Sequence, residues 1–326
     1  MQAVLVREGG ALSFESYRDP EPGTGEVLVE LRAAAVNRRD LLVRKPPGPA
    51  YEFELPLVPG SDGAGVRRDT GEEVVIYPAL GPWGDDERAA GPGWRILGGP
   101  DDGTYAELVA VPEENLFPKP ARFSWEEAAA FPLAGMTAYR ALFSVGGLDA
   151  GQTVLVLGAG SGVSSFAVQL AAQAGARVLV TSSSAEKIER ARELGAEAGV
   201  LYTEGDWAEE IRGLTGGAGV DLVLDSVGTT WADSVRSARK GGRIVVFGGT
   251  GGPKVELDVR AVYLNWLSIL GTTMGSRRDF EGLLRMLDEG SLRPAIDSVR
   301  PLAEAEAAHD RIQGGEHFGK LVLAVR

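Results

Sequence analysis

The sequence predicts an α/β protein in which a β-rich domain is interrupted by a second domain with an open, doubly wound parallel sheet. Three observations favour this fold. The first 120 or so residues contain short strands separated by turn residues, apolar runs alternate with helical patterns from Thr153 onward, and the last 55 or so residues return to mixed character. The length of 326 residues suits two domains.

Short strands dominate the first part of the chain. Residues 25–37 (GEVLVELRAAAVN) alternate apolar and polar positions, and residues 69–80 and 103–120 are short strand patterns bounded by turn residues. Residues 81–99 are rich in Gly, Pro, Asp and Trp and predict a loop or lobe. Ser124 and Glu127 form the pattern of a capping box, which predicts the start of a helix that links the two domains.

Strands and helices alternate after this link. The predicted strands span 153–157, 177–181, 198–202, 220–225, 241–249 and 267–271, and the predicted helices span 162–173, 185–195, 206–215 and a segment that ends near residue 239. The strands are short, continuous apolar runs, which is typical of strands buried on both faces of a parallel sheet. Helices of this size between them imply right-handed βαβ units.

Composition excludes several classes of function. The net charge of −13 disfavours a nucleic-acid partner, which needs a basic face. The absence of cysteine excludes a disulfide, a thiolate nucleophile and a Cys-type zinc site, and it suits a cytoplasmic enzyme. The N-terminal residues lack the basic segment of a signal peptide, and no stretch of about 18 apolar residues predicts a membrane span.

The clearest local motif is a strand, a glycine-rich turn and a helix over residues 154–176. Gly158, Gly160 and Gly162 permit a tight turn and a close approach of the backbone to a pyrophosphate at the helix N-terminus. The strict G-x-G-x-x-G spacing is not met, because the sixth position from Gly158 is Val163, and Ser164 stands where the closing glycine is expected. The alternative is a packing turn without a ligand, but its place in a βαβ series favours dinucleotide binding.

The end of the second strand of this domain indicates which dinucleotide is bound. An acidic residue there would accept a hydrogen bond from the ribose of NAD, whereas this chain has Ser182 and Ser183, with Lys187 close behind. Neutral hydroxyls do not repel a 2′-phosphate and a lysine attracts it, so we predict NADP(H). The alternative is that the serines form only a turn and a helix cap and that Lys187 is an ordinary surface residue.

Several segments together resemble the medium-chain dehydrogenase/reductase superfamily, especially its zinc-independent, quinone oxidoreductase-like branch. The resemblance covers nearly the whole chain, and its segments are 56–65 (PLVPGSDGAG), 102–120, 128–142 (AAAFPLAGMTAYRAL), the glycine turn, 216–228, 241–249 and 318–323 (FGKLVL). It implies a GroES-like catalytic domain that begins with residues 1–122, a Rossmann domain at 123–264, and a return segment at 265–326 that completes the sheet and the catalytic domain. The active-site cleft would lie between the domains.

The resemblance also identifies where zinc ligands would stand. The three positions hold Asn37, Ser61 and Leu133, and only Asp62 remains as the acidic neighbour of the metal. One carboxylate does not make a three-ligand zinc site, so we predict that the site holds no metal. The lobe at 81–99, which carries four cysteines in zinc-containing relatives, has none.

The resemblance implies further contacts with the cofactor. Thr137 and the segment Thr272, Thr273 and Met274 would approach the nicotinamide. The remaining predicted cofactor contacts are Gly160, Ser161, Gly162, Val163, Tyr202, Ser226, Val227, Phe247, Gly248, Gly249 and Lys320. Lys320 is expected to meet a cofactor phosphate. Each of these residues has a structural alternative: Tyr202 and Phe247 as core aromatics, Ser226 and Val227 as a strand cap, and Lys320 as a surface charge.

These residues lead to a functional hypothesis. Without a metal, hydride addition to a quinone or an α,β-unsaturated carbonyl is favoured, because the product anion is delocalised. Asn37 is the best candidate for a catalytic contact, since its amide can donate to a carbonyl oxygen, while Asp40 is expected to satisfy backbone donors of its turn. The alternatives are a zinc-free carbonyl or alcohol oxidoreductase and a non-catalytic NADP(H)-binding sensor or partner protein.

The apolar segment at 262–271 predicts a homodimer. An edge strand of the parallel sheet can pair with its symmetry mate there, and twofold dimers are the commonest oligomers. The alternative is that Leu264, Trp266 and Leu267 are core residues of the last strand.

Overall fold

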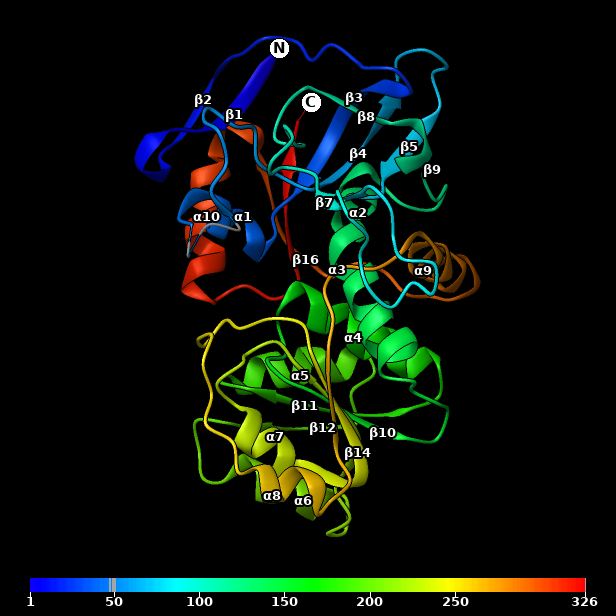
Figure 1. Ribbon diagram of the computed structural model, residues 1–326, viewed down its shortest axis with the longest axis vertical. Helices are drawn as coiled ribbons and strands as arrows, with labels where there is room; N and C mark the ends of the chain where they lie inside the picture. Colours follow the sequence, from blue (N-terminus) through cyan, green and yellow to red (C-terminus); the bar gives the residue numbers. More distant parts are fainter. Residues whose placement is uncertain (47, 49–50, 326) are drawn as a thin grey trace. The chain divides into compact units, whose positions relative to one another are not determined.

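A computed structural model describes residues 1–46, 48 and 51–325, and it divides into two compact units (Figure 1). The first unit comprises Met1–Ala134, Ser276–Phe280 and Arg293–Arg326, and the second comprises Gly135–Gly275 and Glu281–Leu292. The boundaries differ from those predicted at residues 122 and 264. The linking helix α2 (Trp125–Ala130) packs on strands of the first unit, so the division falls after it.

A seven-stranded, mostly antiparallel sheet forms the first unit. Its strand order is β16-β17-β3-β4-β5-β9, and β8 pairs with β3 off this path. The strands are β3 (Glu26–Ala35), β4 (Asp62–Arg67), β5 (Glu73–Ile76), β8 (Leu108–Pro112), β9 (Leu116–Pro118), β16 (Ile296–Pro301) and β17 (Lys320–Ala324). Strands from both ends of the chain therefore share one sheet, as the resemblance implied.

Smaller elements surround this sheet. Strands β1 (Gln2–Val6) and β2 (Leu12–Ser16) form a hairpin, and β6 (Ala79–Leu80) pairs with β7 (Arg95–Ile96) across the predicted lobe. The helices are α1 (Arg38–Arg44), α2 and α10 (Ala305–Gly314), while α3 (Pro132–Tyr139) and α9 (Arg277–Glu289) each span a boundary between units. The capping box predicted at Ser124 and Glu127 is confirmed.

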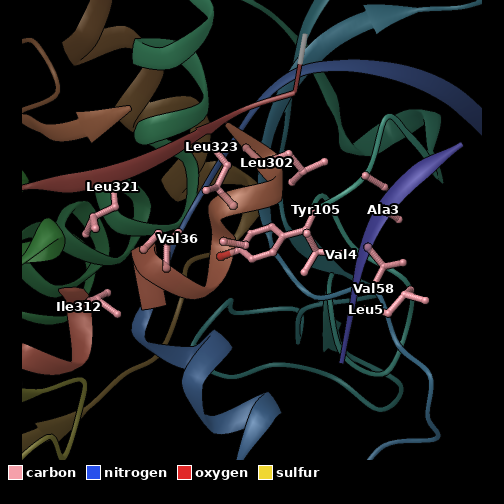
Figure 2. Close-up of a cluster of buried hydrophobic side chains, with 14 residues drawn as sticks. Ala3, Val4, Leu5, Val36, Val58, Tyr105, Leu302, Ile312, Leu321 and Leu323 are labelled. Carbon is pink, nitrogen blue, oxygen red and sulfur yellow. The ribbon is translucent and has the colours of Figure 1, made fainter. Parts of the chain in front are cut away.

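The core of the first unit joins segments that are distant in sequence. Tyr105 lies in a cluster of buried side chains from β1, β17 and α10, which Figure 2 shows with the Tyr105 ring among Val4, Val36 and Leu323. Burial of such side chains is the main stabilising term of the fold, at about 25 cal/mol per Å² of apolar area. Because Tyr105 and α10 share this cluster, the core also fixes the polar groups described below.

The second unit contains a six-stranded parallel sheet with the order β12-β11-β10-β13-β14-β15. The strands are β10 (Thr153–Val156), β11 (Arg177–Ser182), β12 (Ala198–Leu201), β13 (Val220–Asp225), β14 (Ala238–Val246) and β15 (Ser268–Gly271). The predicted doubly wound sheet is confirmed. The order reverses at β10, whose neighbours β11 and β13 lie on opposite sides, and ligands bind at such a point in open α/β sheets.

Helices cover both faces of this sheet. Figure 1 shows α4 and α5 on one face and α6, α7 and α8 on the other. Their bounds are α4 (Gly162–Gln173), α5 (Ala185–Glu193), α6 (Trp207–Leu214), α7 (Trp231–Ser237) and α8 (Val259–Tyr263), and a π-helical segment spans Arg140–Val145. Because the strands are buried on both faces, they have the continuous apolar sequences from which they were predicted.

Within the part of the chain that the structure describes, no helix is both long and apolar enough to cross a membrane.

Candidate functional site

The carboxyl edge of the parallel sheet gathers most of the predicted cofactor contacts. The residues that follow the six strands all lie at this edge, because the strands are parallel. They are Gly160, Ser161, Gly162 and Val163 after β10; Ser182 and Ser183 at the end of β11; Tyr202 after β12; Ser226 and Val227 after β13; Phe247, Gly248 and Gly249 after β14; and Thr272, Thr273 and Met274 after β15. Lys187 lies in the first turn of α5, and Thr137 lies in α3.

The glycine turn has the backbone geometry that a phosphate cradle needs. Gly158 and Gly160 have φ values of 69° and 118°, which disfavour other residues. A β-carbon placed on Gly158 would meet no heavy atom within 4 Å, so the turn borders open space. Helix α4 begins at Gly162, and its first N–H groups have no acceptor within the helix. A dinucleotide pyrophosphate fits this end of the helix.

Two hydroxyl side chains fasten the turn to the sheet. Ser164, which was predicted to stand in for the closing glycine, is fully buried and donates to the carbonyl oxygen of Leu157 at 3.0 Å. The Thr181 hydroxyl accepts from Gly158 N–H at 3.2 Å, which joins the turn to β11. Ser164 therefore keeps the close packing of helix on strand that the closing glycine would otherwise allow.

The ends of β11 and β12 lie side by side. Leu201 is the register partner of Ser182, and Tyr202 N–H donates to the Ser182 carbonyl oxygen at 3.0 Å. The Ser182 side chain is buried, Ser183 is exposed, and Tyr202 is 47% exposed, so Tyr202 is not a core aromatic. Ser184 caps α5 through Lys187 N–H. Ser183 and Tyr202 are thus the two of these residues with side chains on the surface.

A buried carboxylate shapes the loop after β13. Asp225 accepts from the N–H groups of Val227 and Gly228 through one oxygen, at 2.8 and 3.0 Å, and from two hydroxyl groups through the other. Ser226 and Val227 in turn accept from Thr250 and Gly251, so the loops after β13 and β14 are joined. Sequence reasoning missed Asp225, although an acidic residue at the end of a buried strand is a signal of such a turn.

The loop after β15 has an unusual backbone. Met274 is 3% exposed and has a φ of 55°, which a residue with a side chain adopts only at a cost. The Thr272 hydroxyl accepts from Arg140 Nε at 3.0 Å, and its N–H donates to the Val246 carbonyl oxygen. Thr137, one helical turn before Arg140, is 5% exposed. These contacts fix the loop from which Thr272 and Thr273 are predicted to approach the nicotinamide.

A second polar cluster lies in the first unit, where the zinc-ligand positions were predicted. Lys320 Nζ is 2.6 Å from Asn37 Oδ1 and 2.9 Å from Asp62 Oδ2. Asn37 Nδ2 donates to Asp62 Oδ2 at 2.9 Å and to the Ala35 carbonyl oxygen at 3.4 Å. Asp62 Oδ1 accepts from Leu133 N–H at 2.7 Å. The three polar side chains are 6%, 0% and 2% exposed for Asn37, Asp62 and Lys320.

Two predictions are corrected by this cluster. Lys320 was expected to meet a cofactor phosphate, but its ammonium is buried and paired with Asp62. Asn37 was expected to donate to a substrate carbonyl, but both amide protons have acceptors within the protein, and the amide oxygen accepts from Lys320. Asn37 therefore has no donor left for a substrate in this arrangement.

The neighbouring residues extend the network through the core. Asp40 Oδ2 accepts from Asn37 N–H at 2.8 Å, as predicted for the turn, and from the Tyr105 hydroxyl at 2.9 Å. His309 Nε2 lies 3.3 Å from the same hydroxyl. Burial raises the pKa of Asp40 and raises that of Tyr105 well above its usual value, so the phenol keeps its proton. No sequence pattern signalled that Tyr105 and His309 meet.

Because His309 is buried, we expect the free energy of unfolding to fall at acid pH. Burial, with a smaller effect from the charge of Arg44, lowers the pKa of His309 from 6.5 to about 3. The unfolded chain therefore binds the proton first, and this contribution to stability is complete above about pH 6.5 and is lost as the pH falls toward 3. The slope should reach about 1.4 kcal/mol per pH unit.

The measurement is urea unfolding at pH 7 and pH 5 for the wild type and for His309→Gln, which does not titrate. The raised pKa of Asp40 makes stability rise as the pH falls, and it does so in both proteins. The difference in stability loss between the wild type and the variant therefore reports on His309. We expect the wild type to lose more stability than the variant over this range. Equal losses would show that His309 is not the group responsible.

Zinc does not fit the residues of this cluster. Asn37, Ser61 and Leu133 offer an amide, a hydroxyl and an aliphatic side chain, and the Ser61 hydroxyl already donates to the Leu97 carbonyl oxygen and accepts from Arg39. Zinc sites in proteins use Cys, His and carboxylate ligands. In the described ranges, no group of three or more His, Cys, Asp or Glu side chains could hold a metal ion.

Two family models match the chain. One is described as alcohol dehydrogenase GroES-like domain and matches residues 23–121. The other is described as zinc-binding dehydrogenase and matches residues 162–289. The first match falls in the antiparallel sheet and its flanking loops, and the second begins at the N-terminus of α4.

Individual relatives extend over the full length. The chain is 34% identical to a zinc-type alcohol dehydrogenase-like protein of Schizosaccharomyces pombe, over 96% of this chain and 95% of the relative. It resembles a crystal structure of an NAD-dependent alcohol dehydrogenase with a TM-score of 0.95 and 41% identity, covering 100% of both chains. It also resembles a 2-octenoyl-CoA carboxylase reductase solved with NADP and 2-octenoyl-CoA, with a TM-score of 0.88 and 27% identity over 99% of this chain and 87% of the other.

Proposed function

Because the chain belongs to the medium-chain dehydrogenase/reductase superfamily and is an oxidoreductase of that superfamily, we propose that it is an NADPH-dependent, zinc-independent reductase of quinones or α,β-unsaturated carbonyl compounds. The observation that carries the proposal is the Asn37–Asp62–Lys320 cluster, in which a buried ammonium ion and no metal-ligand set stand at the predicted zinc position. Bound NADPH would supply the hydride.

The chemistry of the acceptor follows from this cluster. Reduction of a simple ketone places a full negative charge on one oxygen, which a zinc ion stabilises strongly in metal-dependent enzymes. Hydride addition to a quinone or an enone leaves a phenolate or an enolate, whose charge is delocalised and needs less stabilisation. The solved relative that holds 2-octenoyl-CoA, a conjugated acceptor, supports the same class.

Preference for NADPH is supported by the end of β11. Ser182 and Ser183 place no carboxylate beside the ribose position, and Lys187 follows in the first turn of α5. The relative solved with NADP agrees with this preference, whereas the relative with 41% identity is named NAD-dependent. The dissociation constants of NADPH and NADH therefore test this preference independently of turnover.

Turnover tests the proposed activity. NADPH oxidation is followed with a naphthoquinone, a linear enone and a 2-enoyl thioester as acceptors. The saturated ketone and the saturated aldehyde of the same chain length as the enone are tested beside them. We expect turnover with at least one conjugated acceptor and little with the saturated carbonyls. Turnover of the saturated carbonyls alone would favour a zinc-free carbonyl or alcohol oxidoreductase, and NADPH binding without any turnover would favour a sensor or partner protein.

A homodimer is also proposed. Strand β15 ends the parallel sheet, and the adjoining segment exposes the large apolar side chains of Val259, Tyr263, Leu264 and Trp266, at 69%, 61%, 59% and 71%. Leu264 and Trp266 are thus not core residues, although Leu267 is. An unpaired strand edge beside exposed apolar groups fits a second copy related by a twofold axis.

Replacing Trp266 by glutamate is expected to shift this dimer toward monomer, because the change places a charge within the apolar patch. Sedimentation velocity over a range of protein concentrations measures the shift. Phe14→Glu, in β2 and 45% exposed, is the matched control and should leave the dimer intact. A wild type that remains monomeric at all concentrations would contradict the proposal. The cytoplasmic location stays a prediction.

A further inference from the structure

Lys320 is a buried lysine with fewer hydrogen-bond acceptors than its ammonium can use. Its ammonium has three protons. Asn37 Oδ1 and Asp62 Oδ2 accept two of them, and the ammonium makes no other hydrogen bond among the described residues. A donor that is buried to this extent and still has a proton without an acceptor is costly, so its position calls for an explanation.

The strand register brings the three side chains together. Val322 of β17 lies opposite Ala35 of β3, and Ala35 lies opposite Asp62 of β4. Continuing the antiparallel register by two residues places Lys320 opposite Asn37, and Val36 N–H donates to the Leu321 carbonyl oxygen between them. The cluster is therefore fixed by the backbone of three adjacent strands.

The charges fix the side-chain orientations. Rotation of Lys320 away from the cluster would leave the Asp62 carboxylate buried without a cation, and loss of one partner from a buried ion pair costs far more than loss of a surface pair. Asp62 is held at its other oxygen by Leu133 N–H, and Asn37 is held by Asp40 through its backbone. The side-chain amide of Asn37 cannot flip without losing the contacts of its oxygen and its nitrogen.

A divalent metal is disfavoured by the same arrangement. The single carboxylate of the cluster already carries an ammonium ion, so a metal at Asp62 would stand close to a like charge at low effective dielectric. The family model whose description mentions zinc matches residues 162–289 and contains none of the three cluster residues, so its name does not place zinc at this cluster.

We propose that Lys320 is a positioning residue of the candidate site: its ammonium fixes Asn37 and Asp62 and occupies the place beside the Asp62 carboxylate that a cation would take, so that the site operates without a divalent metal and rejects one. Polar groups that are already held in their working orientation need no reorganisation during turnover, so Lys320 acts through Asn37 and Asp62. The turnover part of this inference rests on the proposed function, and the metal and cofactor-binding parts do not.

Three variants test the inference. Lys320→Met removes the charge and keeps a long side chain, Lys320→Arg keeps the charge, and the double variant Lys320→Met with Asp62→Asn removes both charges. The matched control is Lys119→Met, which removes another largely buried lysine of the same unit that pairs with an acid, Glu73. Each protein is examined for kcat and KM, for NADPH affinity by fluorescence, for melting temperature and for bound zinc after dialysis against zinc chloride.

Lys320→Met should lower kcat by about tenfold or more, a loss confined to the reacting state, with NADPH affinity unchanged. Lys320→Arg should regain most of kcat. The double variant should regain melting temperature, since no uncompensated charge stays buried, but not kcat. Lys119→Met should leave kcat unchanged. The wild type should bind no stoichiometric zinc.

Three results would overturn the inference. The first is a large loss of NADPH affinity with kcat retained in Lys320→Met, which would make the lysine a cofactor-phosphate contact. The second is full recovery of kcat in the neutral double variant. The third is stoichiometric zinc in the wild type. If the wild type reduces no acceptor, the proposed function fails, while the zinc and NADPH measurements still decide whether Lys320 rejects metal and leaves the cofactor untouched.

Discussion

Replacing Asp225 by alanine is expected to lower the free energy of unfolding by about 3–5 kcal/mol, because four donors lose their acceptor in a fully buried place. Two of these donors are backbone N–H groups in the loop after β13, which carries Ser226 and Val227. The variant should therefore also bind NADPH more weakly. Urea unfolding followed by tryptophan fluorescence measures the first effect, and fluorescence titration with NADPH measures the second.

Asp206→Ala is the control for this variant. Asp206 caps α6 through Glu209 N–H and pairs with Arg236 on the surface of the same unit. Loss of such a cap costs about 1 kcal/mol and leaves the sheet edge unchanged. Equal destabilisation in the two variants, or a change below about 1 kcal/mol for Asp225→Ala, would contradict the account of this loop.

Combining Ser183→Asp with Lys187→Glu should reverse the cofactor preference, with a change of about 100-fold or more in the ratio of NADPH to NADH affinity, equivalent to about 2.7 kcal/mol. A carboxylate at the end of β11 can accept from the 2′-hydroxyl of NADH and repels the 2′-phosphate of NADPH. Removal of the Lys187 charge acts in the same direction. The measurement is the dissociation constant of each cofactor for the wild type and the variant.

Arg190→Glu controls for charge reversal on the same helix. Arg190 lies one turn beyond Lys187 in α5, so its replacement changes the net charge by the same amount as Lys187→Glu alone, farther from the end of β11. We expect only a small change in the dissociation constants of both cofactors. If Ser183→Asp with Lys187→Glu weakens the binding of NADPH and NADH equally, the 2′-phosphate does not lie beside the end of β11.

The parallel-sheet unit was predicted almost residue by residue, because its signals are local. Helix α4 begins and ends as predicted at residues 162 and 173, and all six strands were identified from apolar runs. Three segments differ: β14 spans Ala238–Val246 and was predicted at 241–249, α8 was not predicted, and one helix ends early. The helix expected to reach residue 239 ends at Ser237, because β14 begins at Ala238 and pairs there with Val220 beside a register shift in β13.

The polar cluster of the first unit could not be predicted in the same way. Lys320 and Asn37 are 283 residues apart, and only the pairing of β17 with β3 makes them neighbours. The sequence showed correctly that Asp62 remains as the only acidic group among the predicted zinc positions. It did not show that a lysine from the other end of the chain neutralises that acid, and so Lys320 was assigned to a phosphate.

The structure bears on the predicted residues of the two units in different ways. The structure places the predicted cofactor contacts after the parallel strands at one sheet edge, and their contacts with NADP(H) stay predictions. Asp40 was expected to satisfy its turn, and this is confirmed by its bond to Asn37 N–H. Contacts formed within a few residues, such as this one, were thus predicted more reliably than contacts set by strand pairing.

The most direct test of the central claim is to follow the hydride itself. NADPH that carries deuterium on the transferred position of its nicotinamide ring is incubated with the enzyme and a linear enone, and the product is examined by mass spectrometry and NMR. We predict the saturated ketone with deuterium on the carbon β to the carbonyl group. Deuterium on the carbonyl carbon, giving the allylic alcohol, would contradict the proposed reduction of the conjugated double bond.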